Sequence, residues 1–182
     1  YEEKRPELTT AQRKMLSHYD NATLYNDSIV AQIVKRFQKE DAVVIYVPDH
    51  GEECYEEDRG FICRNHSANI DWPLAHYEFE IPFWIYCSPK YIRNHRDIYR
   101  QIRKAKDKRF MTDALPHLLL YLAGIETPTY KEEYNILSPK YNEMRPRILK
   151  NSADYDQLRD EHLKKVEKEN SKKEKSKKGD KK

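Results

Sequence analysis

A short apolar run that ends in a proline, an acid, a histidine and a glycine constrains this chain more than any other feature. Residues 42–47 are all apolar and mostly β-branched or aromatic, which predicts a strand buried on both faces. Pro48 ends the run, and Asp49, His50 and Gly51 follow at once. These residues therefore come at the carboxyl end of a strand, where open α/β sheets place their ligands.

Asp49 and His50 are candidate metal ligands. A carboxylate supplies a hard oxygen and an imidazole a borderline nitrogen, a mixture that suits Zn²⁺ or Mn²⁺. Neighbouring strand residues point to opposite sides, but both can reach one ion where the backbone turns. Gly51 lacks a side chain, which suits a close approach of backbone or substrate. The residues alone leave a second interpretation open, in which Asp49 belongs to a turn and His50 lies on the surface.

A long helix is predicted immediately before the strand, from about residue 10 to 39. Thr9 and Gln12 have the spacing of a capping box, and Lys35 and Arg36 suit the negative end of the helix dipole. A helix that leads directly into an apolar strand is typical of a parallel α/β sheet. The inward-facing pattern of the helix comprises Met15, Leu16, Tyr19, Ala22, Thr23, Asn26, Ile29, Val30, Ile33, Val34 and Phe37.

Further elements are predicted after the Asp-His pair. Residues 52–72 are polar, which predicts a loop. A loop of this length inside a compact domain is usually functional or poorly ordered. Residues 79–87 predict a second buried strand, with Pro82 at its edge or start. A basic helix is expected from residue 92 to 103.

The remainder of the chain predicts two helices around an irregular segment. Thr112 is expected to cap a helix over residues 113–123, which Gly124 ends. Prolines and tyrosines beyond residue 125 indicate an irregular wrap over the surface, and residues 154–168 suggest a charged helix. The core-facing leucines of the first of these helices are Leu115, Leu118, Leu119 and Leu122.

The lysine-rich end of the chain accounts for its positive charge. Residues 163–182 hold ten lysines against four acidic residues, so the formal net charge of +3 comes from this tail and the rest is net acidic. This balance argues against a nucleic-acid-binding face on the folded part. We expect a solvated, disordered tail that could touch acidic partners.

The three cysteines leave the redox state open. Cys54, Cys63 and Cys87 fit no zinc ribbon, and the chain has no Cys-x-x-Cys pair. Cys54 and Cys63 flank one polar loop, so a disulfide there and two thiols are both compatible with the spacing. No stretch reaches the 18 or more apolar residues of a membrane span, and Tyr1 begins no signal peptide. We therefore expect any membrane attachment to belong to sequence outside this chain.

Four segments, in consistent order, resemble the C-terminal half of the bacterial phosphoethanolamine transferases, which are sulfatase-like members of the alkaline phosphatase superfamily. They are YDNATLYNDSIV at 19–30, DHGE at 49–52, IPFWIY at 81–86, and TD at 112–113 followed by LLLYLAGI at 118–125. The resemblance implies the α/β fold class, as the C-terminal part of an alkaline-phosphatase-like mixed sheet flanked by helices. Residues 1–150 would then belong to the catalytic domain, and residues 151–182 would form a charged helix and a disordered lysine-rich tail.

The resemblance also implies a zinc-dependent reaction. In this family a threonine attacks the phosphate of phosphatidylethanolamine, and the phosphoethanolamine group then passes to a hydroxyl of lipid A or a related glycan. Asp49 and His50 match the family's metal-binding pair, with Zn expected and Mn as an alternative. His66 is the candidate for the family's histidine that contacts the phosphoryl group. Its loop is longer than the family pattern, so His76 is a rival for that role.

One departure from the family pattern limits what this chain can do. The nucleophilic threonine lies in the family's N-terminal half, and the chain's threonines at 9, 10, 23 and 112 fall in helices or their caps. The histidine motif that precedes the family's long helix is also missing. Charged residues make up 36% and mean hydropathy is −1.04, as expected of a fragment. We therefore expect the isolated chain to be inactive and to need the N-terminal half of the same enzyme.

The family's location adds two expectations. The parent enzyme would sit in the bacterial inner membrane through an N-terminal segment absent here, with this domain in the periplasm. An oxidising periplasm would favour a Cys54–Cys63 disulfide.

Two alternatives stay open. One is a sulfatase or phosphodiesterase of the same superfamily. The other is a non-catalytic remnant domain whose basic tail binds anionic surfaces.

Overall fold

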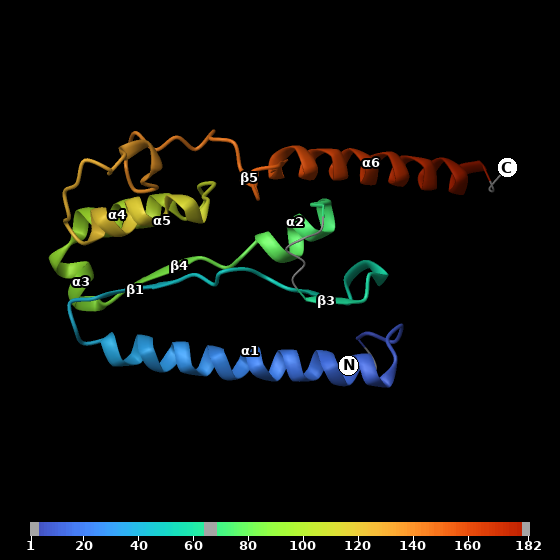
Figure 1. Ribbon diagram of the computed structural model, residues 1–182, viewed down its shortest axis with the longest axis horizontal. Helices are drawn as coiled ribbons and strands as arrows, with labels where there is room; N and C mark the ends of the chain where they lie inside the picture. Colours follow the sequence, from blue (N-terminus) through green and yellow to red (C-terminus); the bar gives the residue numbers. More distant parts are fainter. Residues whose placement is uncertain (1–3, 64–68, 180–182) are drawn as a thin grey trace. The chain divides into compact units, whose positions relative to one another are not determined.

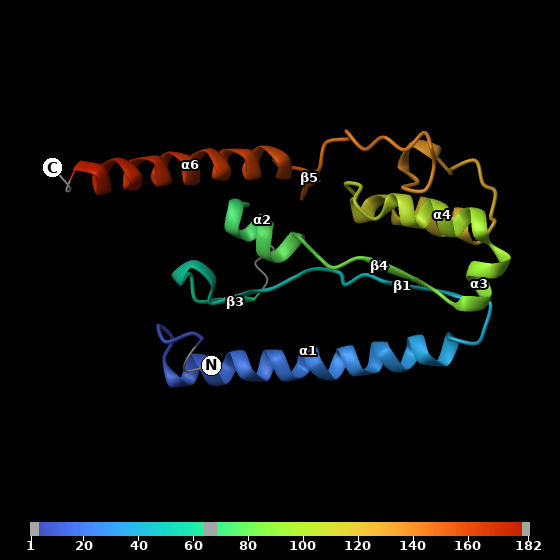
Figure 2. The same ribbon diagram turned by 180° about the vertical axis from the view of Figure 1, so that it is seen from behind.

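The structure is a computed structural model that describes residues 4–63 and 69–179 (Figures 1 and 2). It divides into two compact units, each built from separate stretches of the chain. The first comprises Tyr1–Val47 and Pro82–Arg103, and the second comprises Pro48–Ile81 and Lys104–Lys182. The Asp-His pair therefore begins the second unit.

Helix α1 (Thr10–Phe37) is the longest element of the first unit and confirms the predicted helix. The predicted inward-facing pattern is wrong for most of its members, because Leu16 alone is buried while Met15, Ile29, Ile33 and Phe37 are exposed. Both halves of the expected capping box are present. The Gln12 N–H donates to Thr9 Oγ1 over 3.3 Å, and the Thr9 N–H donates to Gln12 Oε1 over 2.8 Å. These bonds satisfy amide groups that would otherwise lack helical partners.

Strands β1 (Val43–Tyr46) and β4 (Trp84–Cys87) confirm the two predicted strands in shorter form. They pair antiparallel, with Val43 opposite Cys87 and Tyr46 opposite Trp84. The parallel pairing expected from the helix–strand order is wrong for these two strands, because the chain enters β4 at the end where it left β1. The expected burial on both faces is also only partial, since all four residues of β1 are half-buried.

The basic segment after β4 forms two helices where one was predicted. Ser88 caps α3 (Pro89–Asn94) by accepting a hydrogen bond from the Tyr91 N–H over 3.0 Å, and Pro89 occupies the first turn. Helix α4 (Arg96–Ala105) follows. The break falls at His95, whose ψ of 51° is not helical. Ser88 and Pro89 are strong starting signals for a helix, which explains why it begins before residue 92.

In the second unit, the residues predicted as a loop (52–72) contain a hairpin, and a helix that was not predicted follows them. Strands β2 (Glu53–Cys54) and β3 (Phe61–Cys63) pair antiparallel, with the short 3₁₀-helix η1 (Glu56–Asp58) between them. Helix α2 (Trp72–Phe79) begins at Asp71, whose Oδ1 accepts from the Leu74 N–H over 3.1 Å. Phe79 therefore ends a helix, so the predicted strand from residue 79 is wrong in its first part.

The leucine-rich helix is observed as α5 (Leu115–Leu122), preceded by the 3₁₀-helix η2 (Thr112–Ala114). Thr112 lies inside η2, so its expected role as the cap is wrong. Gly124 ends α5 as predicted: its φ is 65°, and the Ile125 N–H donates to Leu120 O over 2.9 Å. Leu118 is fully buried, whereas Leu119 is exposed.

An irregular segment follows α5, as expected, and it leads into the last helix. It contains the 3₁₀-helix η3 (Glu132–Tyr134) and the short antiparallel strands β5 (Ile148–Leu149) and β6 (Ala153–Asp154). Helix α6 (Tyr155–Gly179) packs against α2. The core there comprises Ala75, Leu149 and Tyr155, with Ile70, Trp72, Phe79 and Leu158 packed on it.

The last helix extends beyond its predicted end at residue 168. Its backbone stays helical through the lysine-rich segment to Gly179, where composition predicts disorder. Lysine and glutamate are good helix formers, so once α6 has begun against α2 no residue before Gly179 stops it. Among the described residues, no helix has the length and apolar character needed to cross a membrane.

Candidate metal centre

Asp49 and His50 lie directly after β1 and their side chains face each other. His50 Nε2 is 3.5 Å from Asp49 Oδ2, and the His50 N–H donates to Asp49 Oδ1 over 3.1 Å. The Asp49 side chain is 85% exposed, whereas that of His50 is 20% exposed. The predicted pair is therefore brought together on one side of the turning backbone, with its carboxylate open to solvent.

A backbone carbonyl orients the His50 ring. His50 Nδ1 lies 2.8 Å from Gly51 O, and a carbonyl can only accept, so Nδ1 carries the proton. The lone pair of the neutral ring is then on Nε2, the nitrogen that faces Asp49. Metal-binding histidines are commonly fixed in this way by a hydrogen bond from their second nitrogen.

Gly51 anchors the pair to the end of α2. Its N–H donates to Glu78 O over 2.8 Å. A Cβ on Gly51 would lie 2.2 Å from Tyr77 O, closer than any real Cβ contact. The close approach expected at Gly51 is therefore confirmed, and the partner is the backbone of α2.

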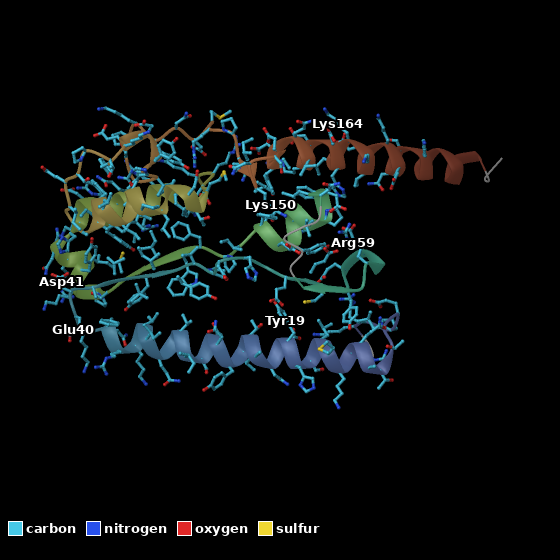
Figure 3. The ribbon with its side chains drawn as sticks, in the orientation of Figure 1. Tyr19, Glu40, Asp41, Arg59, Lys150 and Lys164 are labelled. Atoms are coloured by element: carbon cyan, nitrogen blue, oxygen red, sulfur yellow. The ribbon has the colours of Figure 1, made fainter. Side chains whose placement is uncertain are left out.

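An ion network that runs from a buried glutamate to the surface supports the neighbouring hairpin. Glu53 is fully buried and pairs with Arg59, and Arg59 Nη1 also lies 2.5 Å from Asp71 Oδ2 (Figure 3). Burial raises the pKa of Glu53 despite its hydrogen bond to Arg59. At Asp71, burial acts to raise the pKa, but hydrogen bonds from Arg59 and the Leu74 N–H lower it overall. The network fastens the β2–β3 hairpin to the start of α2.

The sequence did not reveal this network. Its longest link joins Arg59 to Asp71, which are twelve positions apart, and nothing in their spacing marks them as partners. The one available signal was Asp71 followed by Trp72 and Pro73, which has the pattern of a helix start.

The phosphoryl role stays a prediction for both candidate histidines. His66 lies outside the described residues. His76 is on α2, where its Nδ1 is 3.0 Å from Glu80 Oε1 and its ring stacks on Trp72 at 5.4 Å. Within residues 4–63 and 69–179, no three His, Cys, Asp or Glu side chains gather as a metal site.

The cysteine prediction also stays open. Glu53 lies opposite Cys63 in the β2–β3 register, which places Cys54 and Cys63 on adjacent strands. The Cys54 side chain is buried, whereas the side chain of Cys63 is outside the described part. Cys87 is buried in β4, and burial raises the pKa of its thiol.

The sequence and the α/β architecture of the chain match known proteins. The Sulfatase family model matches residues 1–125, and the chain belongs to this family. This confirms the predicted superfamily and its fold class.

Two curated relatives are phosphoethanolamine transferases. Phosphoethanolamine transferase EptC of Escherichia coli O18:K1:H7 is 31% identical over 141 residues, which cover 76% of this chain and 23% of the relative. Kdo(2)-lipid A phosphoethanolamine 7''-transferase of E. coli K12 is 28% identical over 99 residues, 53% of this chain and 16% of the relative. The chain thus spans less than a quarter of these relatives.

Two solved structures share the fold. Both are crystal structures of the C-terminal periplasmic domain of EptC from E. coli, 28% identical to this chain, and one is a complex with Zn. The TM-scores are 0.66 and 0.69, covering 83% and 87% of this chain. The chain covers 43% and 44% of those two domains.

Proposed function

We propose that Asp49 and His50 form part of a zinc site in a phosphoethanolamine transferase. The observation that carries the proposal is the facing pair itself: an exposed carboxylate and an imidazole nitrogen 3.5 Å apart, with the ring fixed through Nδ1. A carboxylate and a neutral imidazole are both good zinc ligands. The zinc complex of the related EptC domain supports this choice of metal, with Mn²⁺ as the alternative.

The pair fits zinc as part of a ligand set. Zinc sites use three or four protein ligands, so further ligands would come from the portion of the related domain that has no counterpart in this chain. Bound zinc would act as a Lewis acid and neutralise charge on phosphoryl oxygens. Asp49 would hold the ion from the open side of the turn, while the Gly51 carbonyl keeps His50 Nε2 directed at it.

The proposed reaction moves phosphoethanolamine from phosphatidylethanolamine to lipid A or a related cell-envelope glycan. The names of the relatives support this substrate class. The attacking threonine would lie in the N-terminal half of the same enzyme, and His66 would contact the phosphoryl group. The whole protein would be held at the bacterial inner membrane with this domain in the periplasm, as in the periplasmic EptC domain.

A sulfatase or phosphodiesterase of the same superfamily remains the second candidate, because the family whose model matches the chain is named Sulfatase. The names of the curated relatives favour the transferase. A non-catalytic domain with a basic tail is less favoured, because the Asp49 carboxylate and the His50 ring face each other 3.5 Å apart.

The proposal predicts that Asp49→Ala in the whole protein abolishes transfer, with at least a hundredfold loss, because metal sites depend strongly on each ligand. Transfer from phosphatidylethanolamine in vesicles to purified lipid A is the measurement. Asp97→Ala is the matched control, since Asp97 is an exposed acid that pairs with Arg100 on α4. Full activity of Asp49→Ala would refute the site, and hydrolysis of a sulfate ester without transfer would support the second candidate.

A related prediction concerns the 182 residues alone. We expect them to give no phosphoethanolamine transfer and no phosphodiester cleavage, because they hold too few of the groups that the reaction needs. Turnover by the purified chain that disappears in Asp49→Ala would contradict this expectation.

A further inference from the structure

Helix α6 carries a row of lysines along one side. Lys164, Lys168 and Lys172 follow one another at intervals of four residues, and Lys165 lies beside the first of them. An α-helix turns by about 100° per residue, so these four positions fall within about 100° of its circumference. We call these four residues the lysine face, and Lys164 marks its start on α6 in Figure 3.

The part of α6 that carries the lysine face is open to solvent. Every residue from Leu163 to Lys172 is exposed. The residues of α6 that belong to the core against α2 lie nearer its start, where Tyr155 is buried and Leu158 packs on it. Packing within the second unit therefore does not explain why four lysines share one side of the helix.

Neighbouring acids do not neutralise the lysine face. Among the side chains that the structure describes, the ion pairs of α6 lie in its first turns, at Asp156 and Asp160, and none involves a lysine of the face. Glu161 lies about one turn before the face, and Glu167 and Glu169 lie on its two flanks. The face is therefore a patch of uncompensated positive charge.

The spacing of the lysines makes them repel one another. Like charges four residues apart on a helix are neighbours and destabilise it, and this spacing occurs twice, from Lys164 to Lys168 and from Lys168 to Lys172. Negative charge brought against the face would remove the repulsion. The arrangement lowers the stability of the free helix and favours an anionic partner.

The shape of the lysine face favours an extended anionic surface over a small anion or an apolar groove. Its residues span about 12 Å along the helix, at about 1.5 Å per residue, and lie on an open side of it. The large apolar residues of this segment, Leu163 and Val166, lie on the opposite side of the helix and are 50% and 38% exposed. A bilayer that contains anionic phospholipid presents many negative charges in one plane, which matches a straight row of lysines.

We propose that the lysine face of α6 binds the surface of a bilayer that contains anionic phospholipid. Clusters of four or more basic residues on one helix bind such surfaces through electrostatic attraction. This contact goes beyond the proposed function, because the lysine face belongs neither to the proposed zinc site nor to the proposed reaction. Phosphatidylethanolamine, the proposed donor, carries no net charge, so binding of the donor and binding of the anionic surface are separate.

Sedimentation with lipid vesicles tests the proposal. The purified chain should bind vesicles of phosphatidylcholine and phosphatidylglycerol at least tenfold more strongly than vesicles of phosphatidylcholine alone. Added sodium chloride should weaken this binding, because salt screens the attraction between exposed charges. Equal binding to the two kinds of vesicle, or binding that salt leaves unchanged, would overturn the proposal.

Two matched variants locate the surface. The first removes three charges from the lysine face: Lys164→Gln, Lys168→Gln and Lys172→Gln. The second removes three charges from exposed positions outside α6: Lys35→Gln, Lys39→Gln and Lys104→Gln. The first should bind anionic vesicles at least tenfold more weakly than the parent chain, because each lysine near such a surface strengthens binding about fivefold. The second should bind as the parent does, and both should keep its helical circular dichroism. Equal weakening in the two variants would refute the assignment of the surface.

Competing anions identify the kind of partner. Inorganic phosphate should weaken vesicle binding no more than sodium chloride of the same ionic strength does. Specific displacement by phosphate would overturn the proposal in favour of a small-anion site. Tight binding to double-stranded DNA without binding to anionic vesicles would overturn it in favour of nucleic acid.

The vesicle experiment is also independent of the metal site. Asp49→Ala should bind anionic vesicles as well as the parent chain, because Asp49 lies outside α6. Vesicle binding by a whole protein that has no transferase activity would refute the proposed function and support the lysine face. Transferase activity without any preference for anionic vesicles would do the reverse.

Discussion

At the scale of single residues, Gly51 is the position where space is most limited. A side chain there would meet the backbone carbonyl of Tyr77 at 2.2 Å, and a backbone atom cannot rotate away. We expect Gly51→Ala to destabilise the protein by ~1–3 kcal/mol, as overpacking does. It should also weaken zinc binding at least tenfold, because the displaced turn carries Asp49 and His50. Urea unfolding and zinc titration of the whole protein measure the two effects.

Gly60 offers the control for this substitution. Its φ is 86°, but nothing lies within 4 Å of a Cβ placed there. Gly60→Ala should therefore cost roughly 1–2 kcal/mol from backbone strain alone and leave zinc affinity unchanged. If both variants lost zinc affinity equally, general destabilisation would explain the result for Gly51.

At the scale of elements, the start of α6 is held by Asp156, an acid that pairs with Arg109, Arg147 and Arg159. Asp156 Oδ1 lies 2.6 Å from Arg147 Nη2, and Arg109 pairs with Asp156 Oδ2. The Arg147 hydrogen bond is the main reason why the pKa of Asp156 is lowered. The stabilisation is therefore complete above the unfolded pKa near 3.8 and is lost as pH falls through the lower folded pKa.

This arrangement predicts the effect of Asp156→Asn on stability. The variant should be less stable than the parent by ~1.5–3 kcal/mol at neutral pH, as expected for hydrogen bonds to charged groups. The difference should shrink as pH falls below about 4. Urea unfolding of both chains at several pH values is the test, and a difference that stays constant down to about pH 2 would contradict it. Asp160→Asn is the control, because Asp160 is an exposed acid on the same helix that pairs with Arg159.

The elements that the sequence predicted well are those marked by residues close together in the chain. Helix α1 has its capping box, the end of α5 has Gly124, and β1 is a dense β-branched run. Helix α2 was missed because its starting signal, Asp71, falls at the end of the stretch predicted as a loop, and residues 73–78 were assigned to no element. The antiparallel pairing of β1 and β4 depends on where the intervening chain returns, which no local pattern encodes.

In the candidate site, too, the residues that could be predicted are those that a local pattern marks. Asp49 and His50 were identifiable because they follow a strand directly. The Glu53–Arg59–Asp71 network was not, because its links are made by the folded hairpin. The ring orientation of His50 also needed the structure, since it depends on the carbonyl of Gly51.

At the scale of the whole molecule, the chain is a member of the sulfatase family that carries an arranged pair of candidate metal ligands. Its second unit begins with the Asp-His turn and holds it against α2 through the hydrogen bond from Gly51 to Glu78.

The proposed zinc ligands themselves provide the most direct test. Crystals of the whole domain grown with zinc should give an anomalous difference peak at the zinc edge within bonding distance of an Asp49 carboxylate oxygen and His50 Nε2. The same crystals of His50→Ala should lose that peak. Zinc bound at another position, with neither Asp49 nor His50 within bonding distance of it, would contradict the account.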